Sequence, residues 1–130
     1  MGLIYLDTCI LIYLVERHPL HAAQVETALE SADARLAVSP LVKLECLVQP
    51  LRQGDLVRQR LYEGLLDQLH MLPMDESVYL AAAQLRARFN LRTPDALHLA
   101  CAQVHGCDAL WTNDDRLVAA SHGLAVNILT

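Results

Sequence analysis

Leu3-Ile4-Tyr5-Leu6-Asp7-Thr8 begins with four consecutive apolar residues and ends on a carboxylate and a hydroxyl. An apolar run without polar alternation predicts a strand that is buried on both faces. Asp7 then lies at the carboxyl end of that strand, which is where parallel α/β sheets bind their ligands. Because an isolated buried carboxylate is costly, we expect Asp7 to meet a partner, a metal ion or water.

The composition of the chain predicts a folded domain rather than a disordered or membrane-spanning protein. Of its 130 residues, 54% are apolar and 19% are charged, which is not the composition of a disordered chain. No apolar run reaches the ~20 residues that a membrane-spanning helix needs. Met1 and Gly2 lead directly into the first strand without a basic segment, so no signal peptide is expected. We therefore expect one domain over residues 1–130, located in the cytoplasm.

Net charge and cysteine spacing argue against two simple kinds of site. The net charge of −5 lacks the basic excess that many nucleic-acid-binding proteins carry. Cys9, Cys46, Cys101 and Cys107 form no C-x-x-C pair, and each lies among apolar residues. They are predicted to be small core residues rather than zinc ligands or disulfides.

Strand-like and helical segments alternate along the rest of the chain. Further strands are expected over residues 35–39, 70–74, 107–111 and 125–129. Helices are expected over residues 10–16, 18–31, 56–69 and 75–90, and also after residues 39, 93 and 112, with a turn over 50–54. This alternation predicts an α/β fold, a three-layer α/β/α sandwich around a central, mostly parallel five-stranded sheet. Right-handed crossovers would place the carboxyl ends of the strands at one edge.

Residues 39–48 predict a buried helix that carries an acid on its apolar side. Ser39 is a suitable N-cap, and Pro40 suits the first helical position. On a helical wheel, Glu45 falls within the apolar arc and away from Lys43. A carboxylate on a core-facing side requires a partner. Glu45 therefore belongs either to a polar site or to a buried ion pair with an arginine.

Two more acids lie at a helix start or directly after a strand. Asp95 lies in the first turn of a helix that begins at Thr93 and Pro94, and Asp114 follows the strand that ends at Trp111. Acids are common at helix starts because the helix dipole favours them, so a purely structural role would also explain Asp95. The rest of its helix is strongly apolar and must be buried, which directs Asp95 toward the protein interior.

The four acids are expected to meet at the carboxyl edge of the sheet. They are Asp7, Glu45, Asp95 and Asp114, and neither lysine nor histidine is expected among them. The ligand atoms would then all be oxygen, which suits Mg²⁺ or Mn²⁺ rather than zinc. Because Mg²⁺ usually binds together with substrate phosphates, this set favours metal-assisted hydrolysis of a phosphodiester bond.

The chain resembles the PIN-domain ribonucleases in motifs that span nearly its whole length. These motifs are, in order, Asp7-Thr8, Ser39 with Glu45, Pro94-Asp95-Ala96 and Thr112-Asn113-Asp114. In size the chain resembles the VapC-like toxins of type II toxin–antitoxin pairs. The resemblance implies a PIN-like fold and the cleavage of single-stranded RNA with Mg²⁺ or Mn²⁺. It also implies a homodimer and a cognate antitoxin that blocks the site.

The resemblance further implies roles for individual residues. The catalytic and metal-binding acids would be Asp7, Glu45, Asp95 and Asp114, supported by the hydroxyls of Thr8 and Thr112. Asp115 is an additional acid, so either it or Asp114 would face the metal. Leu117 departs mildly from the family, which often has phenylalanine at that position.

An arginine cluster lies at the start of the helix expected over residues 56–69. Arg52, Arg58 and Arg60 form this cluster. One interpretation is a patch that binds the RNA phosphate backbone. The other is an ordinary solvated helix face, and the sequence is compatible with both.

Other classes of protein share part of this pattern. A phosphatase of the haloacid dehalogenase type requires Asp-x-Asp after its first strand, whereas this chain reads Asp7-Thr8-Cys9. A receiver domain requires a phosphoacceptor aspartate after its third strand, where this chain reads Leu72-Pro73-Met74. A non-catalytic PIN-like binding module would be favoured if one of the four acids were missing. A housekeeping nuclease of RNA processing is the alternative to a toxin.

Overall fold

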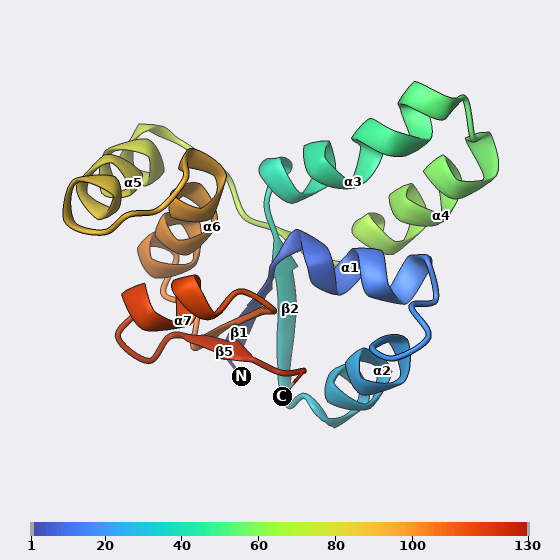
Figure 1. Cartoon of the computed structure of the whole chain (residues 1–130), viewed down its shortest axis with the longest axis horizontal. Helices are drawn as coiled ribbons and strands as arrows, with labels where there is room; N and C mark the ends of the chain where they lie inside the picture. The colour runs from blue at the N-terminus through green and yellow to red at the C-terminus, as the bar shows by residue number, and fades with distance from the viewer. Residues whose placement is uncertain (1, 130) are drawn as a thin grey trace.

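A central sheet of five parallel strands organises the protein (Figure 1). The computed structural model describes residues 2–129. The strands are β1 (Gly2–Leu6), β2 (Ala34–Val38), β3 (His70–Met71), β4 (Ala109–Thr112) and β5 (Ala125–Asn127). Their order across the sheet is β3-β2-β1-β4-β5. The predicted five-stranded sheet is confirmed, and the described strands pair in parallel throughout.

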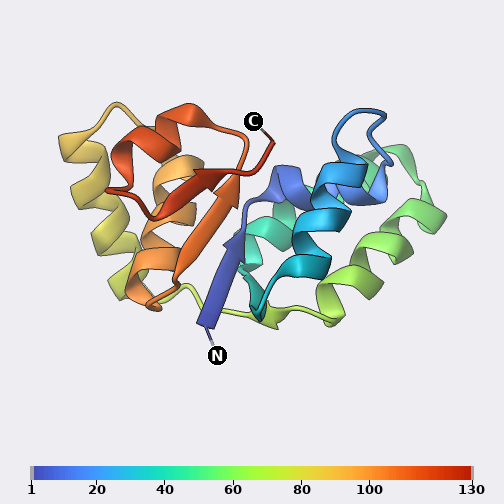
Figure 2. The ribbon, with the colours of Figure 1, turned by 90° about the horizontal axis from the view of Figure 1, so that it is seen from below.

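Helices cover both faces of this sheet, as Figures 1 and 2 show. One layer holds α1 (Thr8–Val15), α2 (Ala22–Ser31), α3 (Pro40–Gln53) and α4 (Leu56–Asp67). The opposite layer holds α5 (Glu76–Arg88), α6 (Thr93–Val104) and α7 (Asp115–Ala120). The predicted three-layer α/β/α sandwich is therefore confirmed.

The order of the strands changes direction between β1 and β4. From β1 the chain builds the sheet toward β2 and β3, then returns to the other side of β1 and continues with β4 and β5. Right-handed crossovers place the helices of these two halves on opposite faces. The carboxyl ends of β1 and β4 consequently lie side by side at a topological switch point, the usual ligand site of open α/β sheets.

Strand β1 is apolar because both of its faces are covered. Tyr5 and Leu6 are both buried, and successive strand residues point to opposite faces. Leu6 lines an apolar cavity with Ile10 and Leu11 of α1. The Tyr5 ring lies against the ring of His98 on α6. The first strand thus joins the two helical layers.

Two helix boundaries differ from the sequence-based prediction. Helix α1 begins at Thr8 rather than at residue 10, because the Asp7 side chain caps it directly. Helix α3 continues to Gln53, so the turn predicted over residues 50–54 was wrong. Pro50 lies inside the helix and is buried, although proline cannot donate the backbone hydrogen bond of that position. Gly54, in the left-handed conformation, ends the helix.

The other differences are shorter elements and do not change the topology. Strand β3 ends at Met71 rather than residue 74, and α2 begins at Ala22 rather than residue 18. All four cysteines are free thiols as predicted, with Cys9 half-buried and the other three buried. Between residues 2 and 129, none of the helices combines the length and apolar character needed to cross a membrane.

Two glycines allow a stability test with opposite signs. Gly54 has a φ of 63°, whereas Gly64 lies within α4 at ordinary helical angles, and a methyl group at either position meets no atom within 4 Å. Gly54→Ala should destabilise the fold by roughly 1–2 kcal/mol, because L-residues are strained in the left-handed region. Gly64→Ala should stabilise it by roughly 0.5–1 kcal/mol, because alanine favours helix. Urea unfolding measures the change in the free energy of unfolding for each variant. Changes of the same sign would contradict the position of Gly54 at the end of α3 and of Gly64 inside α4.

Candidate active site

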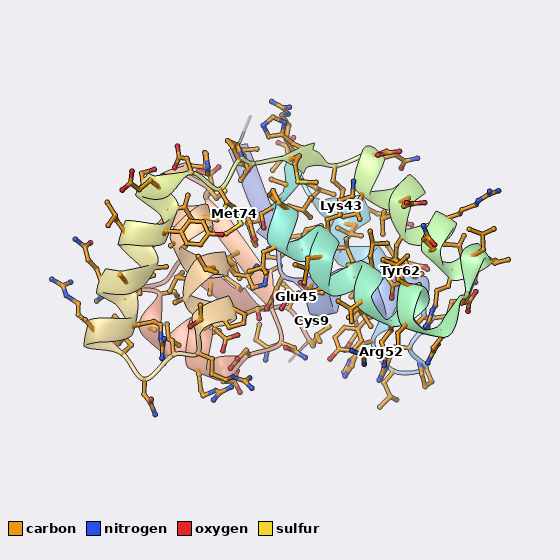
Figure 3. The ribbon with its side chains drawn as sticks, turned by 90° about the horizontal axis from the view of Figure 1, so that it is seen from above. Cys9, Lys43, Glu45, Arg52, Tyr62 and Met74 are labelled. Carbon is orange, nitrogen blue, oxygen red and sulfur yellow. The ribbon has the colours of Figure 1, made fainter. Side chains whose placement is uncertain are left out.

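The candidate site lies where the strand ends of the switch point meet the helices above them. Asp7 directly follows β1, and Thr112 is the last residue of β4. Glu45 of α3 lies near the middle of Figure 3, toward the opposite helical layer. Helices α3 and α6 contact each other across this edge of the sheet. Four separate segments of the chain therefore contribute to one small region.

Asp7 is held in place through both of its carboxylate oxygens. Oδ1 accepts a hydrogen bond from the Thr8 backbone N–H at 2.8 Å, which makes Asp7 the N-cap of α1. Oδ2 accepts a hydrogen bond from the Thr112 hydroxyl at 2.7 Å. This second bond joins the carboxyl ends of β1 and β4. Since each carboxylate oxygen has two acceptor sites, Asp7 retains acceptor capacity for a ligand.

Glu45 receives two donors on a single oxygen. Its Oε1 accepts from the Thr8 hydroxyl and from His98 Nε2, both at 2.6 Å. Its Oε2 has no hydrogen-bond partner within the described part of the chain. Partial burial acts to raise the pKa of Glu45, but the two hydrogen bonds and the attraction of His98 outweigh burial and lower the pKa. The carboxylate is therefore ionised, with one oxygen available to a ligand.

His98 is a member of the site that sequence reasoning missed. Its side chain is only 3% exposed, and Nε2 lies 2.6 Å from Glu45 Oε1 and 3.6 Å from Asp7 Oδ1. The expectation that no histidine lies among the acids was wrong. A signal was present in the sequence, because His98 lies one helical turn after Asp95 within an otherwise apolar run. The predicted alternative for Glu45, an arginine ion pair, does not occur among the described residues.

Asp95 lies at the border of this group. It is in the first turn of α6, and its side chain is 18% exposed, so it is largely buried as predicted. Its one ion pair within residues 2–129 is with Arg92, at 3.5 Å from Nε to Oδ2. Asp95 and His98 share a face of α6 because they are separated by three residues. Asp95 thus lies beside the site without touching Asp7 or Glu45.

Asp114 and Asp115 have different surroundings. The Asp114 N–H donates to Thr112 Oγ1 at 3.1 Å, which connects it to Asp7 through the same hydroxyl. Asp114 caps α7 by accepting from the Arg116 N–H at 2.9 Å. Asp115 instead accepts from the side-chain amide of Asn127 on β5 at 3.1 Å. Of the two acids, Asp114 is the one connected to the site.

The four predicted acids are not equally close. Within residues 2–129, no three acidic, histidine or cysteine side chains are near enough to hold a metal ion together as they stand. Asp7 and Glu45 form the inner pair, linked through Thr8 and His98. The hydroxyls of Thr8 and Thr112 donate to Glu45 and Asp7, whereas Asp95 and Asp114 flank the inner pair.

Cys9 follows the site residues on α1 but differs from them chemically. Burial and, to a smaller extent, the nearby Asp7 carboxylate raise its pKa to about 12. The thiol is therefore protonated at neutral pH. Because a thiol must lose its proton to bind a metal well, Cys9 is not a suitable metal ligand at neutral pH.

The arginine cluster lies along the far part of α3 and the start of α4. Arg58 pairs with Glu16 at 3.2 Å and with Asp55 at 3.8 Å, which favours the structural interpretation for that residue. Arg52 and Arg60 are exposed. Arg52 lies seven residues after Glu45, on the same side of α3, and Figure 3 shows it farther along that helix.

Comparison with known proteins identifies the family of the chain. The PIN domain family matches residues 4–123. Ribonuclease VapC46 of Mycobacterium tuberculosis is 34% identical over 131 residues, which cover 99% of this chain and 98% of that protein.

Solved structures share the fold. A toxin–antitoxin complex from Klebsiella pneumoniae contains a chain with a TM-score of 0.81 and 24% identity, covering 96% of this chain and 97% of that one. VapC20 of Mycobacterium tuberculosis, a toxin that cleaves the sarcin-ricin loop, has a TM-score of 0.77 and 15% identity, covering 90% of this chain and 94% of that one. The chain therefore belongs to the PIN domain family, as a VapC-like member.

Proposed function

We propose that this chain is a metal-dependent endoribonuclease that hydrolyses phosphodiester bonds in single-stranded RNA, and that it is the toxin of a type II toxin–antitoxin pair. The observation that carries the proposal is the inner pair of ionisable acids, Asp7 and Glu45, at the topological switch point of the sheet. The 34% identity to a protein named as a ribonuclease supports it. The proposal treats residues 1–130 as a single PIN domain.

The residues of the site fit Mg²⁺ or Mn²⁺. Glu45 has an unpartnered oxygen and Asp7 has spare acceptor capacity, and carboxylate oxygens are the ligands that these ions prefer. In the proposed enzyme, the inner pair Asp7 and Glu45 would hold the metal, and the flanking acids Asp95 and Asp114 would complete the set. When bound, the ion supplies Lewis-acid activation of water and neutralises charge on the phosphate.

The other residues of the site orient the acids and contact the substrate. Thr8 and Thr112 fix the carboxylates of Glu45 and Asp7 through their hydroxyls. Arg92 and Arg116 are exposed and lie 3.5 Å from Asp95 and Asp114. Guanidinium groups bind phosphate oxygens strongly, so these two arginines are suited to hold the RNA backbone on either side of the site. Arg52 extends this surface along α3.

The proposed partners are an antitoxin and a second copy of the chain. Helices α3 and α4 expose apolar side chains, among them Leu44 and Leu51 at 59% and Val57 at 72%. Exposed apolar side chains gathered on neighbouring helices favour a protein partner. The Klebsiella structure with the same fold is a toxin–antitoxin complex. We place the protein in the cytoplasm, where RNA is available and free cysteines persist.

The first test of this function is a pair of matched charge-removing variants. Asp7→Asn should retain capping of α1 but lose a metal-binding charge. The rate at which the variant cleaves an RNA with single-stranded loops should then fall by more than roughly 100-fold. Loss of a group that only orients a metal ligand typically costs roughly 10–100-fold, and Asp7 is proposed to bind the metal itself. Asp115→Asn, which alters an acid bonded to Asn127, should cleave at nearly the wild-type rate.

Gel assays with Mg²⁺, with Mn²⁺ and with chelator measure these rates, and a fully duplex RNA tests the single-strand requirement. Undiminished cleavage by Asp7→Asn, with contaminating nuclease excluded, would refute the assignment. Cleavage that persists in chelator would refute the metal dependence.

The second test concerns the antitoxin. Because the site is acidic, the inhibitor should present arginine or lysine to it and compete with the metal. The protein encoded by the reading frame next to this one should inhibit cleavage less as Mg²⁺ rises. Asp7→Ala should weaken its binding, and Asp115→Ala should not. Calorimetry measures both affinities, and inhibitor binding that is indifferent to Asp7→Ala and to Mg²⁺ would count against this mode of inhibition.

A further inference from the structure

A buried chain of hydrogen bonds connects the core of the sheet to Glu45. The Tyr5 hydroxyl lies 2.7 Å from Ser39 Oγ and 2.7 Å from His98 Nδ1. His98 Nε2 then lies 2.6 Å from Glu45 Oε1. Tyr5 and Ser39 are fully buried, and His98 is almost so. Residues from β1, the start of α3 and α6 thus end on one oxygen of a site acid.

The Glu45 carboxylate fixes the direction of the hydrogen bond from His98, and the directions of the other bonds follow from where the ring carries its proton. A carboxylate only accepts, so His98 Nε2 carries a proton and donates it to Glu45. An imidazole that carries this one ring proton accepts at Nδ1, and the Tyr5 hydroxyl then donates to it. Ser39 donates in turn to the Tyr5 oxygen. Ser39 Oγ accepts from the backbone N–H of Val42 at 3.4 Å, which completes the chain.

From this network we propose that Tyr5 and His98 are positioning residues for Glu45. The Tyr5 hydroxyl holds His98 in the tautomer that bears its proton on Nε2, and this N–H together with Thr8 fixes Glu45 Oε1. Oε2 then stays available to the divalent cation. The inference rests on the proposed function, because it assigns these residues to the same metal site. Within the described structure, Tyr5 makes no hydrogen bond to Asp7 or to the Glu45 carboxylate.

Loss of the Tyr5 hydroxyl has a specific consequence. His98 Nδ1 would lose its donor, and the tautomer with the proton on Nδ1 would become accessible. That tautomer presents a lone pair to the Glu45 carboxylate, which repels it. Glu45 would then lose one of the two donors that hold Oε1. Outer-shell groups of this kind typically change metal affinity by 10–100-fold when they are removed.

The chain provides a matched control in Tyr62 of α4. Tyr62 is also buried and donates a hydrogen bond through its hydroxyl, to Glu16 Oε2 at 2.7 Å. In Figure 3, Glu45 lies near the middle of the molecule, and Tyr62 lies on the opposite side of α3. Tyr5→Phe and Tyr62→Phe therefore each remove one buried hydroxyl bond, but only the first reaches the site.

The experiment titrates Mn²⁺ into the purified full chain by calorimetry. Tyr5→Phe should weaken Mn²⁺ binding by about tenfold or more. Tyr62→Phe should change the Mn²⁺ affinity by less than about twofold, because a substitution distant from the site acts independently of it. His98→Gln should retain most of the affinity, because its amide N–H can still donate to Glu45, whereas His98→Leu should lose it. If His98→Leu does not fold, the two tyrosine variants and His98→Gln still decide the matter.

A second measurement is independent of metal and of activity. In ¹⁵N spectra of the imidazole, wild-type His98 should show a protonated Nε2 and a bare Nδ1, and Tyr5→Phe should show a mixture of tautomers. If Tyr5→Phe binds Mn²⁺ with wild-type affinity, or if its His98 tautomer is unchanged, this inference is overturned and the proposed function still stands. If the wild type binds Mn²⁺ through Asp7 but cleaves no RNA, the proposed function is overturned and this inference still stands. A wild type that binds no Mn²⁺ would overturn both.

Discussion

Between β1 and β4 the chain reverses the direction in which it builds the sheet, and the hydrogen bond from Thr112 to Asp7 fastens the two strand ends there. The crossovers on either side of this point run over opposite faces. Helix α3 therefore arrives from one layer and α6 from the other. Glu45 and His98 meet above Asp7 for this reason, and the remaining acids border the same edge.

The structural roles of the site acids are compatible with the chemical role proposed for them. Asp7 caps α1 and Asp114 caps α7, and an N-cap contributes about 1 kcal/mol to stability. A structural explanation of these acids therefore does not exclude a catalytic one. Capping uses part of the acceptor capacity of each carboxylate and leaves the rest to a ligand. It also fixes the carboxylate before any ligand binds.

Local sequence signals predicted the parts of this structure that depend on local physics. The apolar run of β1, the Ser39 cap and the inward position of Glu45 follow from burial and from helix periodicity. The alternation of strands and helices was sufficient for the fold class. The helical extension through Pro50 was not predictable in this way, because proline inside a helix is locally unfavourable.

The same limit applies within the site. His98 reads as one polar residue in an apolar helix, and only the fold brings it to Glu45, 53 positions away in sequence. Asp114 and Asp115 are adjacent and chemically alike, so the partners Thr112 and Asn127 distinguish them only in three dimensions. The pairing of Arg58 with Glu16 is also a tertiary contact.

Anomalous diffraction from crystals of the full chain soaked in MnCl₂ tests the central claim most directly. The account predicts a Mn²⁺ peak bonded to carboxylate oxygens of both Asp7 and Glu45, with Glu45 binding through Oε2, and no such peak in crystals of Asp7→Asn. A protein that cleaves RNA with Mn²⁺ while its crystals bind the ion elsewhere, away from Asp7 and Glu45, would contradict it.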